Sequence, residues 1–117
     1  MDVSGLLELR QLQPPGRPDA VARIVRRFLE ETDERLVSLR LAAQNDDALE
    51  LERSAHALKG SAGTVGANEM ADLAARLEQI GREGHVREAS ALVEELESAV
   101  GRARPIFDRV VDTARLP

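Results

Sequence analysis

Cysteine, tryptophan and tyrosine are absent from the sequence, and Phe28 and Phe107 are its only aromatic residues. Without cysteine, disulfide bonds, thiolate metal sites and cysteine nucleophiles are excluded. The core must therefore be mostly aliphatic. Because there is no aromatic stacking platform and no basic patch, we expect no nucleic-acid partner. No apolar run approaches the roughly 18 to 20 residues that span a bilayer, and no basic segment opens the chain. We therefore expect no membrane contact and a cytoplasmic location.

The composition is that of an ordinary globular domain. The chain has 117 residues, of which 43% are hydrophobic and 32% charged, and its net charge of -5 comes from acidic and basic residues that alternate along the sequence. This length leaves room for one domain and one core. We expect a single domain over residues 1–117, with a core bundle at about 19–113. We also expect a monomer.

Apolar residues recur at steps of three and four in long segments, which is the period of an amphipathic helix. The first long segment runs over about 19–44 and has Asp19 as its N-cap. The second follows Asn45 or Asp46, either of which could cap it, and Gly66 is its expected stop.

Two further helical segments follow Gly66. One is closed by Gly81 and Gly84. The other begins near Val86, and its apolar stripe stays in phase across Pro105. The carbonyl that the proline ring would meet belongs to a glycine, which can bend away, so we predict one continuous, kinked helix.

A short apolar stripe around Leu6 ends at the helix-breaking run Pro14-Pro15-Gly16. It predicts a short first helix that covers one end of the fold. No strand-type alternation is present. The sequence therefore predicts an all-α protein, an up-down four-helix bundle with a short additional N-terminal helix.

The stretch 54–66 differs from the rest, because it carries one of only two histidines, the only lysine and several small residues. At roughly 100° per residue, His56 lies about 130° from the centre of the buried stripe. Lys59 lies between His56 and the edge of the core. The residues on the side of His56 are Leu49, Glu52, Gly60 and Gly63.

An exposed imidazole can use a ring nitrogen as a nucleophile. We predict that His56 carries a phosphoryl group, whose charge Lys59 at i+3 could offset. Glycine inside a helix costs about 1 kcal/mol relative to alanine. The glycines beside His56 therefore suggest the close approach of another protein.

The run His56-Ala57-Leu58-Lys59-Gly60-Ser61-Ala62, with Gly66 ten residues after the histidine, resembles the signature of histidine-containing phosphotransfer (HPt) domains. The similarity extends over about 28–96, which is most of the chain. The resemblance implies a phosphorelay intermediate, in which His56 accepts a phosphoryl group from the aspartyl phosphate of one receiver domain and passes it to another.

The resemblance also implies roles for neighbouring residues. Lys59 would stabilise the phosphohistidine, Gly60 would keep the approach open, and Ser61 would support the site. Some members have a glutamine that bonds the imidazole; here the matching position is Glu78, with Gln79 beside it. The partners would be response-regulator receiver domains or a hybrid histidine kinase. This chain would be a carrier without kinase activity or cofactor of its own, and Mg²⁺ would sit on the receiver.

Other interpretations stay open. The chain could be the phosphoacceptor module of a larger sensor or chemotaxis-type histidine kinase, or a helical adaptor that binds a receiver without carrying phosphate. Glu52 and His56 have the i, i+4 spacing of two metal ligands, but no further ligand is evident, so we predict no metal site. His85 is expected to be a surface residue. The residues expected to contact a partner are Leu49, Glu52, Arg53 and Gly63.

Overall fold

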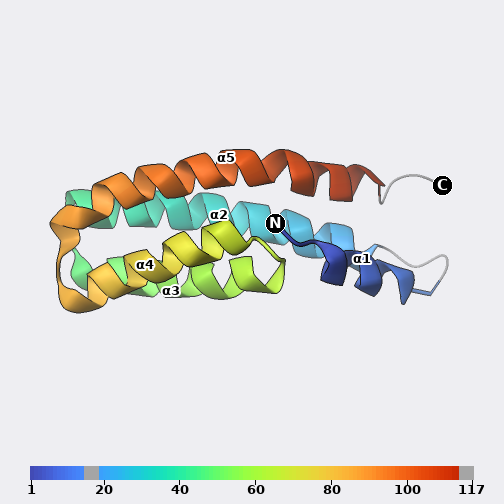
Figure 1. The fold of residues 1–117 in the computed structure, drawn as a ribbon, viewed down its shortest axis with the longest axis horizontal. Coiled ribbons are helices and arrows are strands. Elements are labelled where there is room, and N and C mark those ends of the chain that lie inside the picture. Colours follow the sequence, from blue (N-terminus) through green and yellow to red (C-terminus); the bar gives the residue numbers. More distant parts are fainter. Residues whose placement is uncertain (15–18, 114–117) are drawn as a thin grey trace.

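The computed structural model describes residues 1–14 and 19–113, with the side chain of residue 113 left out. These residues form helices and contain no strand. The helices α2 to α5 pack as an up-down bundle, and α1 lies beside the start of α2 at one end (Figure 1). The molecule measures about 50 Å by 19 Å by 19 Å. The predicted all-α fold is confirmed. The elements are α1 (Ser4–Gln11), α2 (Ala20–Gln44), α3 (Ala48–Thr64), α4 (Asn68–Glu83), the 3-10 turn η1 (Val86–Glu88) and α5 (Ala89–Thr113).

The N-caps of α2 and α3 are both aspartates. Asp19 caps α2 as predicted, because its carboxylate accepts hydrogen bonds from the backbone N–H groups of Val21 and Ala22, at 3.0 and 3.3 Å. The predicted caps of α3, Asn45 and Asp46, were wrong. Asp47 is the N-cap, and its carboxylate accepts from the N–H of Glu50 at 3.1 Å. Asp46 has a positive φ of 56° and belongs to the preceding turn.

The C-terminal end of α4 and the start of α5 differ in part from the prediction. Gly81 does not close α4 but lies inside the helix, buried against α3, and the left-handed Gly84 is the C-cap. The expected start of the last helix at Val86 is the 3-10 turn, and α5 follows at Ala89. From there α5 is unbroken across Pro105, so its predicted continuity is confirmed.

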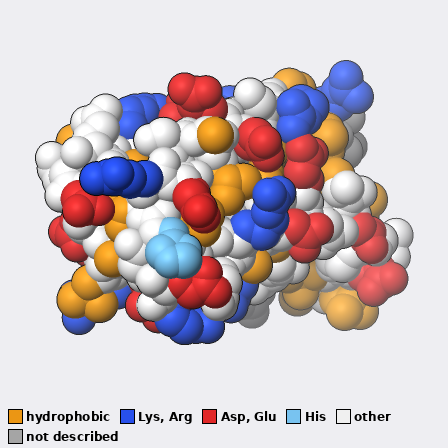
Figure 2. All heavy atoms as spheres, turned by 60° about the vertical axis from the view of Figure 1, so that its left-hand side comes forward, with side chains coloured by type: hydrophobic (Ala, Val, Ile, Leu, Met, Phe, Trp, Pro, Cys, Tyr) orange, Lys and Arg blue, Asp and Glu red, His pale blue; other side chains and the backbone are white. Residues whose placement is uncertain are grey.

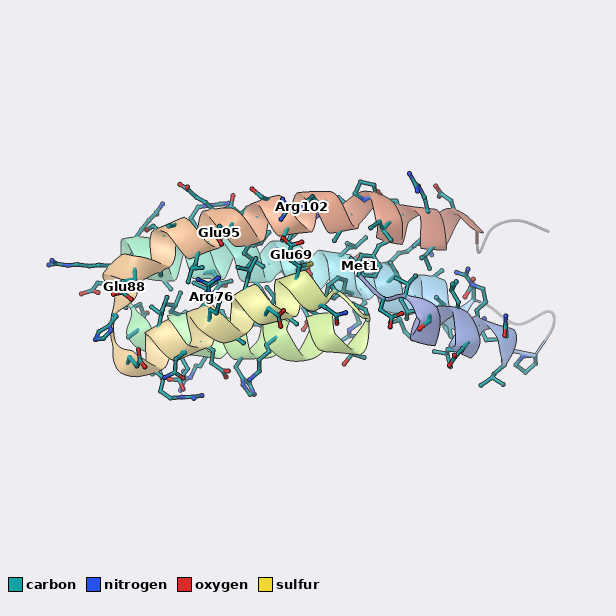
Figure 3. The ribbon with its side chains drawn as sticks, viewed as in Figure 1. Met1, Glu69, Arg76, Glu88, Glu95 and Arg102 are labelled. Carbon is teal, nitrogen blue, oxygen red and sulfur yellow. The ribbon has the colours of Figure 1, made fainter. Side chains whose placement is uncertain are left out.

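The core is aliphatic, apart from the rings of Phe28 and Phe107, whose centroids are 5.3 Å apart. Apart from Glu78, which is buried, the charged side chains of the described residues are at least partly exposed, and acidic and basic groups are interspersed on the face shown in Figure 2. Glu69 on α4 and Arg102 on α5 form an ion pair between these two helices (Figure 3). Exposed pairs of this kind contribute little to stability, so apolar packing holds the bundle together.

The N-terminal segment is fixed to the turn between α3 and α4. The backbone N–H of Asp2 donates to the carbonyl of Gly66 at 2.9 Å, and Leu6 is buried in the core. Gly66 has a φ of 82°, and a Cβ at this position would lie 1.6 Å from the Asp2 carbonyl oxygen. Gly66 therefore ends α3 and also makes room for the chain start. In the part of the chain that the structure describes, no helix has both the length and the apolar character needed to cross a bilayer.

One core position is polar without a partner. Thr32 is fully buried in α2, and its hydroxyl has no hydrogen bond among the described residues. Burying an unpaired hydroxyl costs on the order of 1 to 3 kcal/mol. We predict that Thr32→Val raises the free energy of unfolding by about 1 kcal/mol, measured by urea denaturation. Thr32→Ser keeps the hydroxyl, removes the methyl group and should lower stability. A less stable valine variant would contradict the prediction.

Candidate functional site

His56 projects from the outer face of α3. Its side chain is 69% exposed, whereas Leu51, Ala55 and Leu58 on the opposite face of the helix are fully buried. The exposure predicted from the helical period is therefore observed. The imidazole is held out to solvent by a helix that is anchored on its other side.

Glu78 on α4 connects the imidazole to the lysine. Its side chain is only 7% exposed, and its two carboxylate oxygens have different partners. Oε2 contacts Nδ1 of His56, while Oε1 accepts a hydrogen bond from Nζ of Lys59 at 2.6 Å. The structure thus brings together His56, Lys59 and Glu78, three residues that the sequence analysis singled out. Gln79 is exposed and bonds instead to Glu83 on its own helix.

The carboxylate fixes the imidazole tautomer. The hydrogen bond from Lys59 is the largest influence that lowers the pKa of Glu78, the hydrogen bond from His56 adds to it, and burial opposes both. Glu78 is therefore ionised at neutral pH and can only accept hydrogen bonds. Nδ1 of His56 must carry the proton in this contact. In the neutral imidazole, Nε2 is then the ring nitrogen with a free lone pair.

Arg82 is a charged neighbour that the sequence analysis did not single out. Its Nε donates to Oε1 of Glu52 at 3.3 Å, and its Nη2 lies 3.6 Å from Oε2 of Glu78. The i, i+4 spacing of Glu78 and Arg82 was a signal for this contact. Arg82 places a second cation beside the buried carboxylate and joins α4 to α3 next to His56.

The two glycines beside His56, Gly60 and Gly63, are not required by contacts within the protein. A Cβ built at Gly60 or Gly63 would meet no atom within 4 Å. Alanine would fit at either position and would favour the helix. Packing within the protein therefore does not explain these glycines.

The remaining predicted site residues fall into two groups. Ser61 is half-buried, and its hydroxyl donates to the carbonyls of Ala57 and Leu58, at 3.2 and 3.3 Å, so the structure does not bring it to the imidazole. The others surround His56. A shallow open hollow is lined by Leu49, Glu52, Arg53, His56, Glu78 and Arg82.

The other histidine, His85, lies outside the site. His85 is exposed in the connection between α4 and α5, with its nearest carboxylate, that of Glu83, 3.8 Å away. Among the described residues, no cluster of three or more histidine, aspartate or glutamate side chains could hold a metal ion.

The family model of the Hpt domain matches residues 23–105. The chain belongs to the family of histidine-containing phosphotransfer domains.

Two relatives support this assignment. The crystal structure of histidine-containing phosphotransfer protein B (HptB) from Pseudomonas aeruginosa PAO1 is 29% identical in sequence and superposes with a TM-score of 0.86, over 97% of this chain and 95% of that one. Histidine-containing phosphotransfer protein 1 from Arabidopsis thaliana is 38% identical over 66 residues, which are 55% of this chain. The match spans 43% of the plant protein, less than half of its length.

The ion pair of Glu78 predicts a pH dependence of stability. Its pKa in the folded protein lies below the ordinary value of 4.5, so its contribution is present above about pH 4.5 and is lost as the pH falls through the folded-state pKa. Charged neighbours that face it are His56, Lys59 and Arg82. We predict that the stability advantage of wild type over Glu78→Gln shrinks between pH 5.5 and about pH 3, measured by urea denaturation. Glu83→Gln, an exposed change on the same helix, is the control. A constant difference between wild type and Glu78→Gln would contradict the prediction.

Proposed function

We propose that this protein is a phosphorelay intermediate that carries a phosphoryl group on Nε2 of His56, received from the aspartyl phosphate of one receiver domain and passed to the aspartate of another. Membership of the Hpt family supports a role in histidine phosphotransfer. The observation that carries the proposal for this residue is the contact of Glu78 with Nδ1, which leaves an exposed Nε2 as the nucleophile.

The transfer needs no proton from solvent. The lone pair on Nε2 of His56 attacks the phosphorus atom, a P–N bond forms, and the P–O bond to the receiver aspartate breaks, so that its carboxylate leaves with the electron pair. The Nδ1 proton stays in the hydrogen bond to Glu78, which stabilises the positive charge that develops on the ring. The second transfer is the reverse reaction with another aspartate.

Lys59 is placed to follow the charge. Its ammonium is bound to Glu78 at 2.6 Å, and its side chain is 39% exposed. When a phosphoryl group arrives on the ring, the flexible stem of lysine lets the ammonium interact with the new oxygens as a mobile point charge. We propose this as the role of Lys59.

The rest of the machinery would come from the partner. The sequence contains no nucleotide-binding motif, and phosphoryl transfer of this kind relies on positioning and on cations that neutralise the phosphate. We propose that Mg²⁺ is held by the receiver domain and that this chain acts as a carrier rather than a kinase. A monomer in the cytoplasm, meeting a response regulator or a hybrid histidine kinase, remains part of the proposal.

The partner would dock over the open surface around the imidazole. Leu49 is 55% exposed and supplies an apolar contact at the rim of the hollow. Arg53 and Glu52 add charged groups, while Gly60 and Gly63 leave the helix backbone bare on the other side of His56. We propose that this surface is the receiver-binding face.

The proposal predicts that His56→Gln abolishes phosphate uptake. A receiver domain labelled on its aspartate would be mixed with each protein, and acid-labile label on this chain would be followed by gel autoradiography. His85→Gln, which changes the other histidine, should accept label at the wild-type rate. Uptake by His56→Gln equal to that of wild type would rule out the function. An adaptor without phosphate predicts instead that His56→Ala leaves receiver binding and pathway output unchanged.

For Gly60→Ala we predict opposite effects on stability and on docking. The change should raise the free energy of unfolding by up to about 1 kcal/mol, because alanine favours the helix and its methyl group meets nothing. It should also weaken binding of the receiver, because the methyl group stands where the partner approaches. Urea denaturation and titration calorimetry with a receiver domain measure the two effects. A variant with higher stability and unchanged affinity would show that the partner does not contact this turn.

A further inference from the structure

Gly81 packs against backbone, unlike the glycines beside His56. It is buried within α4, and a Cβ at this position would lie 2.7 Å from the backbone nitrogen of Glu52, 2.9 Å from the carbonyl oxygen of Ala48 and 3.0 Å from Cα of Glu52. Ordinary van der Waals contact begins at 3.4 Å. Here α4 therefore touches the main chain of α3 directly.

This contact lies next to the candidate site on both helices. Gly81 comes three residues after Glu78 on α4, and Glu52 comes four residues before His56 on α3, so each is about one helical turn from its site residue. Because α3 and α4 run antiparallel, the step from Gly81 to Glu78 and the step from Glu52 to His56 go in the same direction along the bundle. Arg82, adjacent to Gly81, bonds to Glu52 across the same contact.

We propose that Gly81 is a positioning residue of the phosphotransfer site. By carrying no side chain, it lets α4 approach α3 closely enough for the carboxylate of Glu78 to reach both His56 and Lys59. The importance of Gly81 for phosphotransfer rests on the proposed function. Its effect on the position of Glu78 concerns the unphosphorylated protein.

A side chain at Gly81 could not be accommodated by local adjustment. The atoms that it would meet belong to the backbone of α3, so no rotamer change can relieve the overlap. The two helices would have to separate or slide by several tenths of an ångström. Glu78 is buried and accepts a hydrogen bond from Lys59 at only 2.6 Å, so such a displacement acts directly on its contacts with Lys59 and His56.

The experiment compares Gly81→Ala with Gly101→Ala. Gly101 is an exposed glycine of α5, where a Cβ would meet nothing within 4 Å, so its variant controls for the loss of a helical glycine. The Gly81 variant would also be made in the Gly101→Ala background, in which the added alanine favours the helix. Circular dichroism checks the fold of each protein.

Three measurements follow the site itself. In Gly81→Ala the ring-nitrogen NMR signals of His56 should shift from a protonated Nδ1 toward a mixture of tautomers. The NMR titration of the Glu78 carboxyl group should move toward its ordinary range. Phosphate uptake from a labelled receiver domain should slow by about 10-fold or more, since displacements below 1 Å in a reacting geometry have effects of this size. Gly101→Ala should match wild type in all three.

A double-mutant cycle tests whether Gly81 acts through Glu78. In a Glu78→Ala background the His56 signals should already be changed, and adding Gly81→Ala should have no further effect. An equal effect in both backgrounds would overturn the proposal, as would unchanged His56 signals in folded Gly81→Ala. Loss of the fold of Gly81→Ala in both the wild-type and the Gly101→Ala background would overturn it as well, because Gly81 would then be a requirement of the fold. The NMR results involve no phosphate, so they stand apart from the His56→Gln test of the proposed function.

Discussion

The site depends on one carboxylate that is shared between two helices. Glu78 has two oxygens and uses one for the imidazole of His56 and the other for the ammonium of Lys59. A buried carboxylate is unfavourable unless cations or hydrogen-bond donors compensate it. Here the compensation comes from the groups that phosphotransfer would use. The interactions that make the buried charge tolerable therefore also orient the imidazole of His56 and keep Lys59 beside it.

A glutamine at this position would have different consequences. Its carbonyl oxygen could accept a hydrogen bond from Nδ1–H of His56, but its NH₂ group can only donate and would face the ammonium of Lys59. Glu78 can accept from both. The disadvantage of the Glu78 carboxylate is its negative charge, which would repel a phosphoryl group. Because Nδ1 and Nε2 are on different sides of the ring, the imidazole separates the two charges, and Lys59 can interact with either.

The helical period predicted which faces are buried, and the family resemblance pointed to Glu78, but other contacts between helices were missed. The exposure of His56 and the cap at Asp19 follow from local pattern, and both were confirmed. The cap of α3 was placed too early because Asn45, Asp46 and Asp47 are adjacent residues with similar capping side chains, and only the turn geometry selects the last one. The contact of Arg82 with Glu52 depends on how α4 packs against α3, which no single segment encodes.

Three glycines show why the rest could not be predicted. In sequence each is a break in a helical pattern, and Gly81 was taken for a helix end. In the structure Gly66 has a positive φ and makes room for Asp2, Gly81 touches the backbone of α3, and Gly60 faces open space. Gly66 is required by the backbone conformation of the turn, and Gly81 by the close spacing of α3 and α4. Of these three glycines, only Gly60 has no explanation within the protein. Since helix propensity disfavours glycine at such a position, Gly60 agrees with the proposed close approach of a partner to His56.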